Sequence, residues 1–190
     1  MGLVEYKKKR TFTETPEPKG GKVTKTKLHF VVQKHAASRL HYDFRLEMGG
    51  VLKSWAVPKG PSLNPADRRL AMMVEDHPYD YRTFEGVIPA GNYGAGIVEI
   101  WDKGTYHALA TEDRKEGEKI LLKELEKGSI KIVMHGKKLK GEFALVKIKG
   151  KQDNAWLLIK HNDKYAFHEP YNSEDHVSKR SKINLARKKA

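Results

Sequence analysis

The chain has 190 residues, enough for one compact domain with flexible ends but not for a second full domain. Its 37 Lys and Arg residues exceed its 24 Asp and Glu residues, and the net charge of +13 favours a polyanionic partner such as nucleic acid over a merely soluble basic surface. The absence of cysteine excludes disulfides, cysteine nucleophiles and thiolate metal sites.

No apolar run approaches the ~18 residues that span a bilayer, and no apolar stretch follows the basic residues of 1–10. We therefore expect no membrane insertion, no signal peptide and a cytoplasmic location. An anionic membrane surface is a weaker partner than nucleic acid, because no amphipathic basic helix with aromatic anchors is evident. Any metal must be held by His, Asp, Glu and water, which suits Mn²⁺, with Zn²⁺ or Co²⁺ as alternatives.

In chain order, residues 1–26 are rich in Lys, Thr, Pro and Gly, which predicts an extended basic arm or a disordered tail. Short apolar or alternating runs then follow one another between glycine-rich turns, a pattern typical of strands. Gly49-Gly50 predicts a hairpin between two of these runs. The expected strands are 28–33, 40–46, 51–57, 70–74, 97–101, 129–134, 142–148 and 155–160.

One segment differs from this pattern. Residues 116–127 place Ile and Leu among charges, and Gly128 follows as a stop signal, so they predict the main helix. Many short strands and one helix predict a mainly β protein, a single-domain β-barrel over 27–170 with short peripheral helices. Residues 171–190 are basic and nearly free of apolar side chains, which predicts a flexible tail.

The segment 41–46 carries the chemistry. Alternation along a strand places Tyr42, Phe44 and Leu46 on a core face and His41, Asp43 and Arg45 on the other face. Residues i and i+2 lie roughly 6.5–7 Å apart along a strand, so two such side chains can bind one ion.

His35 could supply a third ligand from beyond a bend at 36–38, which would leave positions open for water and a phosphate oxygen. The planar guanidinium of Arg45 suits a phosphate bound beside the ion. The spacing alone leaves open a solvent-facing strand with an ion pair between Asp43 and Arg45.

A second polar cluster, residues 75–81, follows the apolar run 71–74. His77 could stabilise or protonate a phosphate oxygen and Tyr81 could hydrogen-bond to it, although the spacing alone favours a simple turn. Lys59 and Arg69 are possible phosphate contacts that, taken singly, read as surface charges. The glycine-rich run 91–96 predicts a tight turn rather than a nucleotide-binding loop, because a strand follows it.

Several long strings closely resemble the 3′-phosphoesterase module of bacterial DNA ligase D. The similarity covers most of residues 10–170, without polymerase or ligase modules, so the chain resembles a stand-alone form. The strings are Phe30-Val31-Val32-Gln33-Lys34-His35, Arg39-Leu40-His41-Tyr42-Asp43-Phe44-Arg45-Leu46-Glu47, residues 52–61, Val74-Glu75-Asp76-His77-Pro78, Phe84-Glu85-Gly86-Val87-Ile88-Pro89 and Trp156-Leu157-Leu158-Ile159-Lys160.

This resemblance implies a Mn²⁺-dependent β-barrel enzyme that trims a 3′-terminal ribonucleotide and then removes the remaining 3′-phosphate, leaving a 3′-OH. The implied substrates are DNA or RNA–DNA primer–template ends, and possible partners are a DNA ligase, a polymerase and Ku. Matching positions imply His35, His41 and Asp43 as metal ligands, with Arg45 and His77 at the scissile phosphate and Tyr81 beside them. They also imply supporting or phosphate-contacting roles for Gln33, Lys59, Arg69 and Glu75, and an arm that closes over the site through Arg10 and Glu17.

The family's arm usually reads Arg-Asp-Phe, whereas this chain has Arg10-Thr11-Phe12, so we expect a weaker phosphodiesterase step. Two alternatives come from other classes of protein. One is a non-haem Fe(II) oxygenase-like barrel using His41, Asp43 and His77 as its triad. The other is a nucleic acid-binding β-barrel without catalysis.

Overall fold

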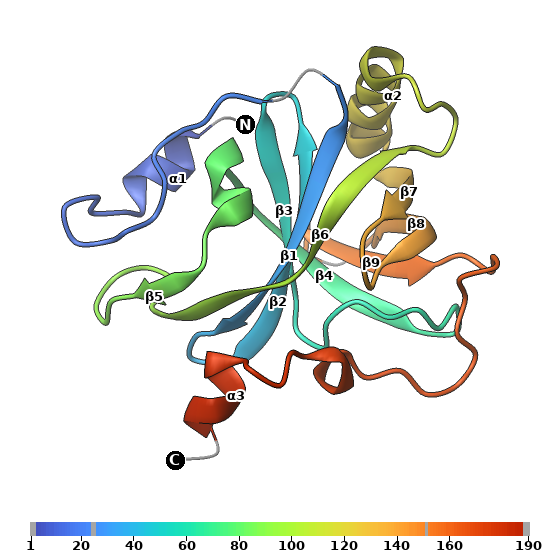
Figure 1. Ribbon diagram of the computed structural model, residues 1–190. Helices are drawn as coiled ribbons and strands as arrows, with labels where there is room; N and C mark the ends of the chain where they lie inside the picture. The colour runs from blue at the N-terminus through green and yellow to red at the C-terminus, as the bar shows by residue number, and fades with distance from the viewer. Residues whose placement is uncertain (1–2, 24–25, 151, 188–190) are drawn as a thin grey trace.

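An antiparallel β-barrel forms the body of the molecule (Figure 1). The computed structural model describes residues 3–23, 26–150 and 152–187. Within them the strands run in the order β1-β2-β3-β4-β9-β8-β7-β6-β5, and β1 also pairs with β6, which closes the sheet. The strands are β1 (Leu28–Ala36), β2 (Leu40–Met48), β3 (Val51–Val57), β4 (Arg68–His77), β5 (Gly86–Ile88), β6 (Gly96–Ala108), β7 (Ser129–His135), β8 (Lys140–Lys147) and β9 (Ala155–Lys160).

This architecture confirms the mainly β, single-domain barrel with short peripheral helices that the sequence predicts. Every strand predicted from the sequence is present, and β4 and β6 extend well beyond the predicted ranges. The strand β5 is too short for its alternation to show in the sequence. The helical elements are α1 (Val4–Lys8), η1 (Tyr79–Thr83), α2 (Arg114–Lys127), η2 (Ser173–His176) and α3 (Lys182–Arg187).

The predicted helix is α2, which lies at the upper end of the barrel in Figure 1. It begins two residues earlier than the sequence suggests, because the carboxylate of Asp113 caps it by accepting a 2.8 Å hydrogen bond from the amide of Glu116. It ends at Gly128, whose φ of 77° lies in the left-handed region. The Gly128 stop was predicted from the sequence, whereas the Asp113 cap was not.

The barrel interior is apolar on the face that alternation predicts. Tyr42, Phe44 and Leu46 of β2 are buried in the main core, where Phe44 packs near Trp55 of β3. The opposite face of β2 is buried as well, since Asp43 and Arg45 are only 6% and 3% exposed. A solvent-facing polar strand is therefore excluded, and these charges need partners within the protein.

The N-terminal segment lies against the barrel and begins with a short helix. Residues 4–8 form α1, with Glu5 in its first turn and basic residues in its last, which suits the helix dipole. The helix is anchored by Tyr6, which is fully buried and donates a 2.6 Å hydrogen bond to the carbonyl of Pro18. Tyr6 packs against Tyr81 beside the end of β4, so the arm is docked on the barrel.

The segment 171–187 differs from the predicted flexible tail, because it packs on the barrel. Four of its side chains are buried, namely Tyr171, Ser173, Ser181 and Ile183, whereas Leu185 is exposed. Glu99 of β6 accepts hydrogen bonds from the Ser181 hydroxyl at 2.6 Å and from the amide of Ile183 at 3.2 Å, which fixes the start of α3. Segments held by polar contacts of this kind need no periodic pattern of apolar residues, so the sequence pattern does not reveal them. Residues 1–2, 24–25 and 188–190 of the predicted arm and tail lie outside the described residues.

A buried lysine joins this segment to the barrel. Lys34 of β1 is 1% exposed, and its ammonium lies 2.9 Å from a carboxylate oxygen of Glu174 in η2 and 2.6 Å from the side-chain oxygen of Asn184 in α3. The other Glu174 oxygen accepts a hydrogen bond from Tyr42, which is paired with Lys34 across β1 and β2. Glu174 therefore holds together two strands of the barrel.

We expect Glu174→Ala to lower the stability by about 2 kcal/mol, because it leaves a buried ammonium without its carboxylate. This should appear as a fall of about 4–8 °C in Tm. The double variant Lys34→Met with Glu174→Gln should recover most of the loss, since it buries no unpaired charge and keeps an acceptor for Tyr42. A Glu174→Ala protein that melts like wild type would contradict the pairing.

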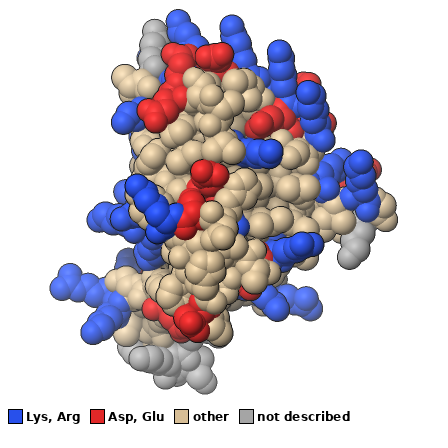
Figure 2. All heavy atoms as spheres, turned by 90° about the vertical axis from the view of Figure 1, so that its right-hand side faces the viewer, with Lys and Arg blue, Asp and Glu red and all other residues tan. Residues whose placement is uncertain are grey.

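The excess positive charge does not form a continuous basic patch on the face seen in Figure 2. On the side seen in Figure 2, Lys and Arg are scattered and interspersed with Asp and Glu. Among the described residues, no helix is long and apolar enough to cross a membrane.

Candidate active site

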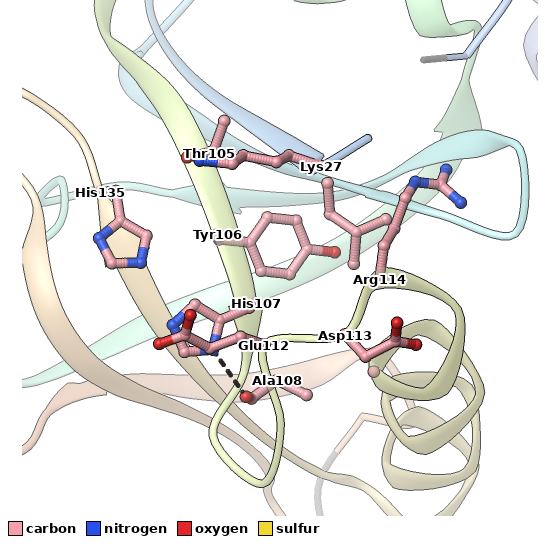
Figure 3. A pocket seen from close by; sticks show the side chains of 11 residues that line it. Lys27, Thr105, Tyr106, His107, Ala108, Glu112, Asp113, Arg114 and His135 are labelled. Carbon is pink, nitrogen blue, oxygen red and sulfur yellow. Dashed lines mark hydrogen bonds between the residues drawn. The ribbon is translucent and has the colours of Figure 1, made fainter. Parts of the chain in front are cut away.

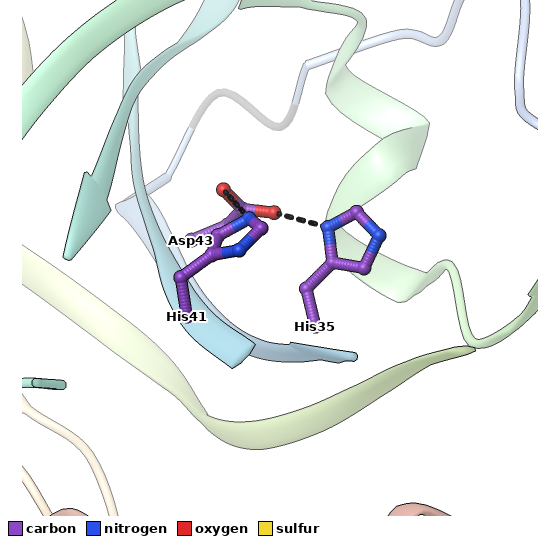
Figure 4. Close-up of side chains that lie close together, drawn as sticks. All are labelled: His35, His41 and Asp43. Carbon is purple, nitrogen blue, oxygen red and sulfur yellow. Dashed lines mark hydrogen bonds and ion pairs between the residues drawn. The ribbon is translucent and has the colours of Figure 1, made fainter. Parts of the chain in front are cut away.

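The hairpin of β1 and β2 brings together three side chains that could hold a metal ion. Its register pairs His35 directly with His41, and Asp43 lies two residues further along β2. The two imidazole rings are 4.8 Å apart between centroids, and both turn toward the carboxylate of Asp43 (Figure 4). One ligand atom from each residue can be chosen so that all three lie within 4.8 Å of one another. The bend predicted at 36–38 is the turn that makes this possible.

The far nitrogen of each imidazole is held by a backbone carbonyl. The Nε2 of His35 lies 2.8 Å from the carbonyl oxygen of Gly94, and the Nδ1 of His41 lies 2.9 Å from that of Arg39. A carbonyl can only accept, so these nitrogens carry the protons and donate. In the neutral rings the lone pairs then lie on His35 Nδ1 and His41 Nε2, the atoms that face Asp43.

This donor set fits a divalent cation. The facing nitrogens lie 3.3 and 3.6 Å from the two carboxylate oxygens of Asp43, so three acceptors converge on one point. Ligand atoms around an ion at ~2.0–2.2 Å are separated by similar distances, and only small side-chain shifts are needed. Imidazole and carboxylate without thiolate suit Mn²⁺, Co²⁺ or Zn²⁺.

Arg45 flanks the cluster and is fixed on three sides. Its guanidinium donates to Asp43 at 3.0 Å, to the side-chain oxygen of Gln33 at 2.7 Å and to the hydroxyl of Ser54 at 2.9 Å. Although burial would raise the pKa of Asp43, the Arg45 guanidinium and the two imidazoles hold it well below its ordinary value. Asp43 therefore stays ionised and available to a metal.

A bulge in β4 supplies the next wall of the site. Leu52 of β3 pairs with His77 whereas Ser54 pairs with Val74, so β4 carries one extra residue over this stretch. Bulges re-aim side chains beside active sites. Here Val74, Glu75 and His77 all line one cavity, although strict alternation would turn Val74 and Glu75 to opposite faces.

The arm inserts Arg10 between these groups. Its Nε donates to Glu17 at 2.9 Å, and its Nη1 donates to Glu75 at 3.1 Å. Its Nη2 lies 3.2 Å from His77 Nε2, and its guanidinium lies over the ring of Tyr6, 3.9 Å from the centroid. Only 4% of the Arg10 side chain is exposed, so the arm forms part of the cavity wall rather than a cover above it.

His77 is held as a neutral base. Burial, together with the Arg45 and Arg10 guanidinium groups, lowers its pKa well below the ordinary value. Its Nδ1 donates to the carbonyl of Glu75 at 2.9 Å, which leaves the Nε2 lone pair to accept from Arg10. A ring in this state orients its neighbours and has no proton on Nε2 to donate to a substrate.

Tyr81 is held as a neutral donor. Burial raises the pKa of its hydroxyl well above the ordinary value, and the nearby carboxylate of Glu17 raises it further. The hydroxyl donates to Glu17 at 2.9 Å, while the ring lies 4.7 Å from the Arg45 guanidinium and 4.8 Å from the His77 ring. Tyr81 thus links the arm to the side of the cavity where Arg45 lies.

Taken together, these walls enclose a cavity of about 180 Å³. Among the described residues, the charges in and around it balance when the imidazoles are neutral. The cations are Lys9, Arg10 and Arg45, and the carboxylates are Glu17, Asp43 and Glu75. A divalent ion would therefore leave the cavity with a net positive charge, which suits a phosphate.

The sequence model of a known family, the DNA ligase D 3′-phosphoesterase domain, matches residues 33–147, which include the cluster, Arg45 and His77. The chain belongs to this phosphoesterase family. It is 52% identical over 166 residues to the multifunctional non-homologous end joining protein LigD of Pseudomonas aeruginosa, covering 85% of this chain and 19% of that protein.

Two further relatives carry the same name. The LigD protein of Mycolicibacterium smegmatis is 43% identical over 163 residues, with 85% of this chain and 21% of that protein covered. That of Mycobacterium bovis is 41% identical over 167 residues, with 87% and 21% covered. This phosphoesterase-family chain therefore spans about a fifth of the length of these curated relatives.

Not every residue implied by the family resemblance lies in the cavity. Lys59 is exposed beyond the end of β3 and does not line it. Arg69 lies near the opposite end of β4 from His77, where it donates to Asp67 at 2.8 Å and to the carbonyl of Tyr171 at 2.6 Å. Neither side chain meets the cluster in this structure, and Arg69 instead anchors the segment 171–187.

Gln33 and Thr11 also lie outside the lining of the cavity. Gln33 is fully buried, and its amide nitrogen donates to the carbonyls of Tyr81 and Phe84, both at 2.9 Å. Its amide oxygen accepts from Arg45, so it positions Arg45 and does not line the cavity. Thr11, where the resemblance implies an Asp, is exposed and does not line the cavity. The oxygenase-like alternative is not supported, because both ring nitrogens of His77 are engaged and His77 lies outside the metal-ligating group.

Several residues at the site were not identified by motif spacing. Ser54 contacts both Arg45 and His77 and lies inside one of the strings that resemble the family. Gly94, whose carbonyl orients His35, belongs to the glycine-rich turn 91–96. Tyr93 in that turn and Lys9 in the arm also border the cavity. Residues beside a turn that touches a site could be found only once the fold is known.

A larger cavity of about 370 Å³ lies between the start of α2 and the strands β6 and β7 (Figure 3). Two of its polar side chains already have partners in or beside its wall. Arg114 pairs with Glu47 at 3.0 Å and with Glu118 at 3.3 Å, and His107 hydrogen-bonds to the carbonyl of Ala108. Chemistry rather than volume therefore identifies the smaller cavity as the candidate active site of this phosphoesterase-family chain.

Proposed function

We propose that this chain is a Mn²⁺-dependent 3′-end-healing phosphoesterase. It would remove 3′-terminal ribonucleotides and 3′-phosphates from nucleic acid ends and leave a 3′-OH for DNA repair. The observation that carries the proposal is the convergence of His35, His41 and Asp43 beside Arg45, in a chain of the DNA ligase D 3′-phosphoesterase domain family. Family membership by itself supports a role in processing ends during DNA repair.

In this proposal His35 Nδ1, His41 Nε2 and the carboxylate of Asp43 hold the ion. When bound, Mn²⁺ would supply positive charge that polarises the terminal phosphate and lowers the pKa of water. The Gly94 and Arg39 carbonyls keep the two imidazoles in the tautomers that ligation requires.

Arg45 binds the phosphate beside the ion. Its bonds to Gln33, Ser54 and Asp43 use one N–H on each of its three nitrogens. The two other N–H groups, one on each terminal nitrogen, are left to donate to phosphate oxygens. Because its neighbours hold the guanidinium in place, it stabilises the charge that develops in the transition state without prior rearrangement.

His77 supports this arrangement as a neutral ring, which its lowered pKa favours over a role as proton donor. Through Nε2 it aligns Arg10, whose Nη2 keeps one N–H for a phosphate oxygen. Tyr81 and Glu75 hold the arm against the cavity through Glu17 and Arg10.

The test is incubation of a primer–template that ends in one ribonucleotide and a 3′-phosphate, with and without Mn²⁺, read on a sequencing gel. We expect loss of the 3′-phosphate and of the ribonucleotide only when Mn²⁺ is present. The non-catalytic alternative predicts salt-dependent binding and an unchanged 3′ end. An unchanged end under all metal conditions would reject the enzyme.

The products define the partners. A strand restored to a 3′-OH is a substrate for a ligase or a polymerase. We therefore propose that this chain acts before a DNA polymerase and a DNA ligase, on ends held by Ku. The relatives are named as multifunctional end-joining proteins, and this chain matches about a fifth of each.

A further inference from the structure

A large aromatic side chain stands at the mouth of the candidate active site. Tyr93 lines the cavity, yet 50% of its surface is exposed. It lies in the glycine-rich turn 91–96 between β5 and β6. The metal-ligating and phosphate-binding groups described above do not use it.

The turn that carries Tyr93 is fixed relative to the metal cluster. The carbonyl of the next residue, Gly94, accepts the hydrogen bond from His35. At the end of the turn, Gly96 has a φ of +146°, and a Cβ there would lie 2.1 Å from the carbonyl oxygen of Ala36, so β1 and the turn are in close contact. Tyr93 is therefore held at a set distance from the cluster.

The cavity itself is too small to enclose a nucleotide. Sites that bury a whole drug-sized ligand measure about 300–1,000 Å³, whereas this cavity measures about 180 Å³. A phosphate held by the cluster and Arg45 would leave the base of its nucleotide outside. Tyr93 is the exposed aromatic side chain at that opening among the described residues that line the cavity.

The ring is also positioned by cations. Lys9 Nζ lies 4.7 Å and Arg10 Cζ 5.6 Å from its centroid. These contacts limit the motion of the ring and place positive charge next to it, where the phosphate of a strand would approach. An aromatic ring next to cations is the combination that single-stranded nucleic acid sites use.

We propose that Tyr93 is a stacking platform for the nucleobase of the 3′-terminal nucleotide. The inference rests on the proposed function and adds a base subsite to it. Because every base has a π-face, the subsite would accept purines and pyrimidines alike. It would bind the end by its last base while the phosphate enters the cavity.

The experiment compares strands ending in a 3′-phosphate whose last nucleotide either carries a base or lacks one. For Tyr93→Ala we expect KM on the base-containing end to rise about tenfold, the range for loss of one base stack being about 5- to 150-fold. On the abasic end the same variant should match wild type, because there is no base to lose. Tyr93→Phe should restore wild-type KM on both ends.

Tyr165→Ala is the matched control, since Tyr165 is 42% exposed and does not line the cavity. A Tyr93→Ala defect of equal size on both ends would overturn the proposal and assign Tyr93 to the support of Arg10. The absence of any defect would also overturn it.

Binding of the same strands, followed by fluorescence anisotropy with Mn²⁺ present, separates this inference from the proposed function. If wild type binds both strands but cleaves neither, the proposed function fails, and the base dependence of binding still decides the role of Tyr93. We then expect Tyr93→Ala to weaken binding of the base-containing strand alone.

Discussion

Asp43→Asn is expected to reduce Mn²⁺-dependent removal of a 3′-phosphate by at least about a hundredfold, because groups that merely orient metal ligands already contribute about 10- to 100-fold. Asn keeps the size of the side chain but removes the charge that faces both imidazoles and Arg45. The cavity is neutral without an ion, so weaker metal binding also removes its attraction for phosphate. Initial rates on the primer–template measure the loss.

A second readout separates metal binding from general damage. Wild type should gain about 2.7 kcal/mol of stability when Mn²⁺ is present at a hundred times its Kd, and Asp43→Asn should gain almost none at that concentration. Asp153→Asn, at an exposed position in the turn before β9, is the matched control and should behave as wild type. If Asp43→Asn retained both the activity and the Mn²⁺-induced rise in Tm, the proposed metal centre would be wrong.

Arg10→Ala is expected to lower activity by about a hundredfold while the barrel remains folded. The change leaves the buried carboxylates of Glu17 and Glu75 without their shared guanidinium, which costs about 3–5 kcal/mol for a buried pair and should release the arm. Displacing groups around a reacting phosphate by as little as ~1 Å can cost about a hundredfold in rate. Hydrogen exchange of residues 4–23 should rise, whereas exchange in β1 and β2 should not.

Thr11→Asp is the neighbouring control. The sequence alone led us to expect a weaker phosphodiesterase step from Thr11. Because Thr11 is exposed and outside the cavity, we now expect a carboxylate at this position to change both activities by less than about twofold. A large gain in phosphodiesterase activity would show that the arm rearranges during the reaction and brings this position to the substrate. Full activity in Arg10→Ala would show that the arm is dispensable.

Strand periodicity predicted much of this molecule. Alternation along 41–46 predicted that Tyr42 lies on the core face and Asp43 on the polar face. The glycines at 49–50 predicted the hairpin, and their φ angles are 62° and 78°. These signals are local, because alternation and positive φ depend on one strand or one turn. The short bend after His35 also sufficed to predict that it could approach His41.

Other features depend on contacts between distant residues. The bulge that turns Val74 and Glu75 into one cavity arises from the pairing of β3 with β4, and neither strand alone shows it. The docking of 171–187 depends on Glu99 and Lys34, more than 70 residues away from their partners. Arg69 has the right charge for a phosphate contact, and only the fold shows that it donates to the carbonyl of Tyr171.

The cavity has two halves, one formed by the hairpin of β1 and β2 and the other by the docked arm, and the register of the hairpin affects how each half folds. The ligating side chains span only residues 35–43 and meet as soon as one hairpin closes, whereas Arg10 reaches Glu75 across 65 positions of the chain. Contacts near in sequence form early and cheaply, and long-range docking of a terminal segment opens most readily. We therefore expect the hairpin with its three ligands to stay folded while the arm that carries Arg10 opens and closes. Opening of the arm would let a strand end enter and leave.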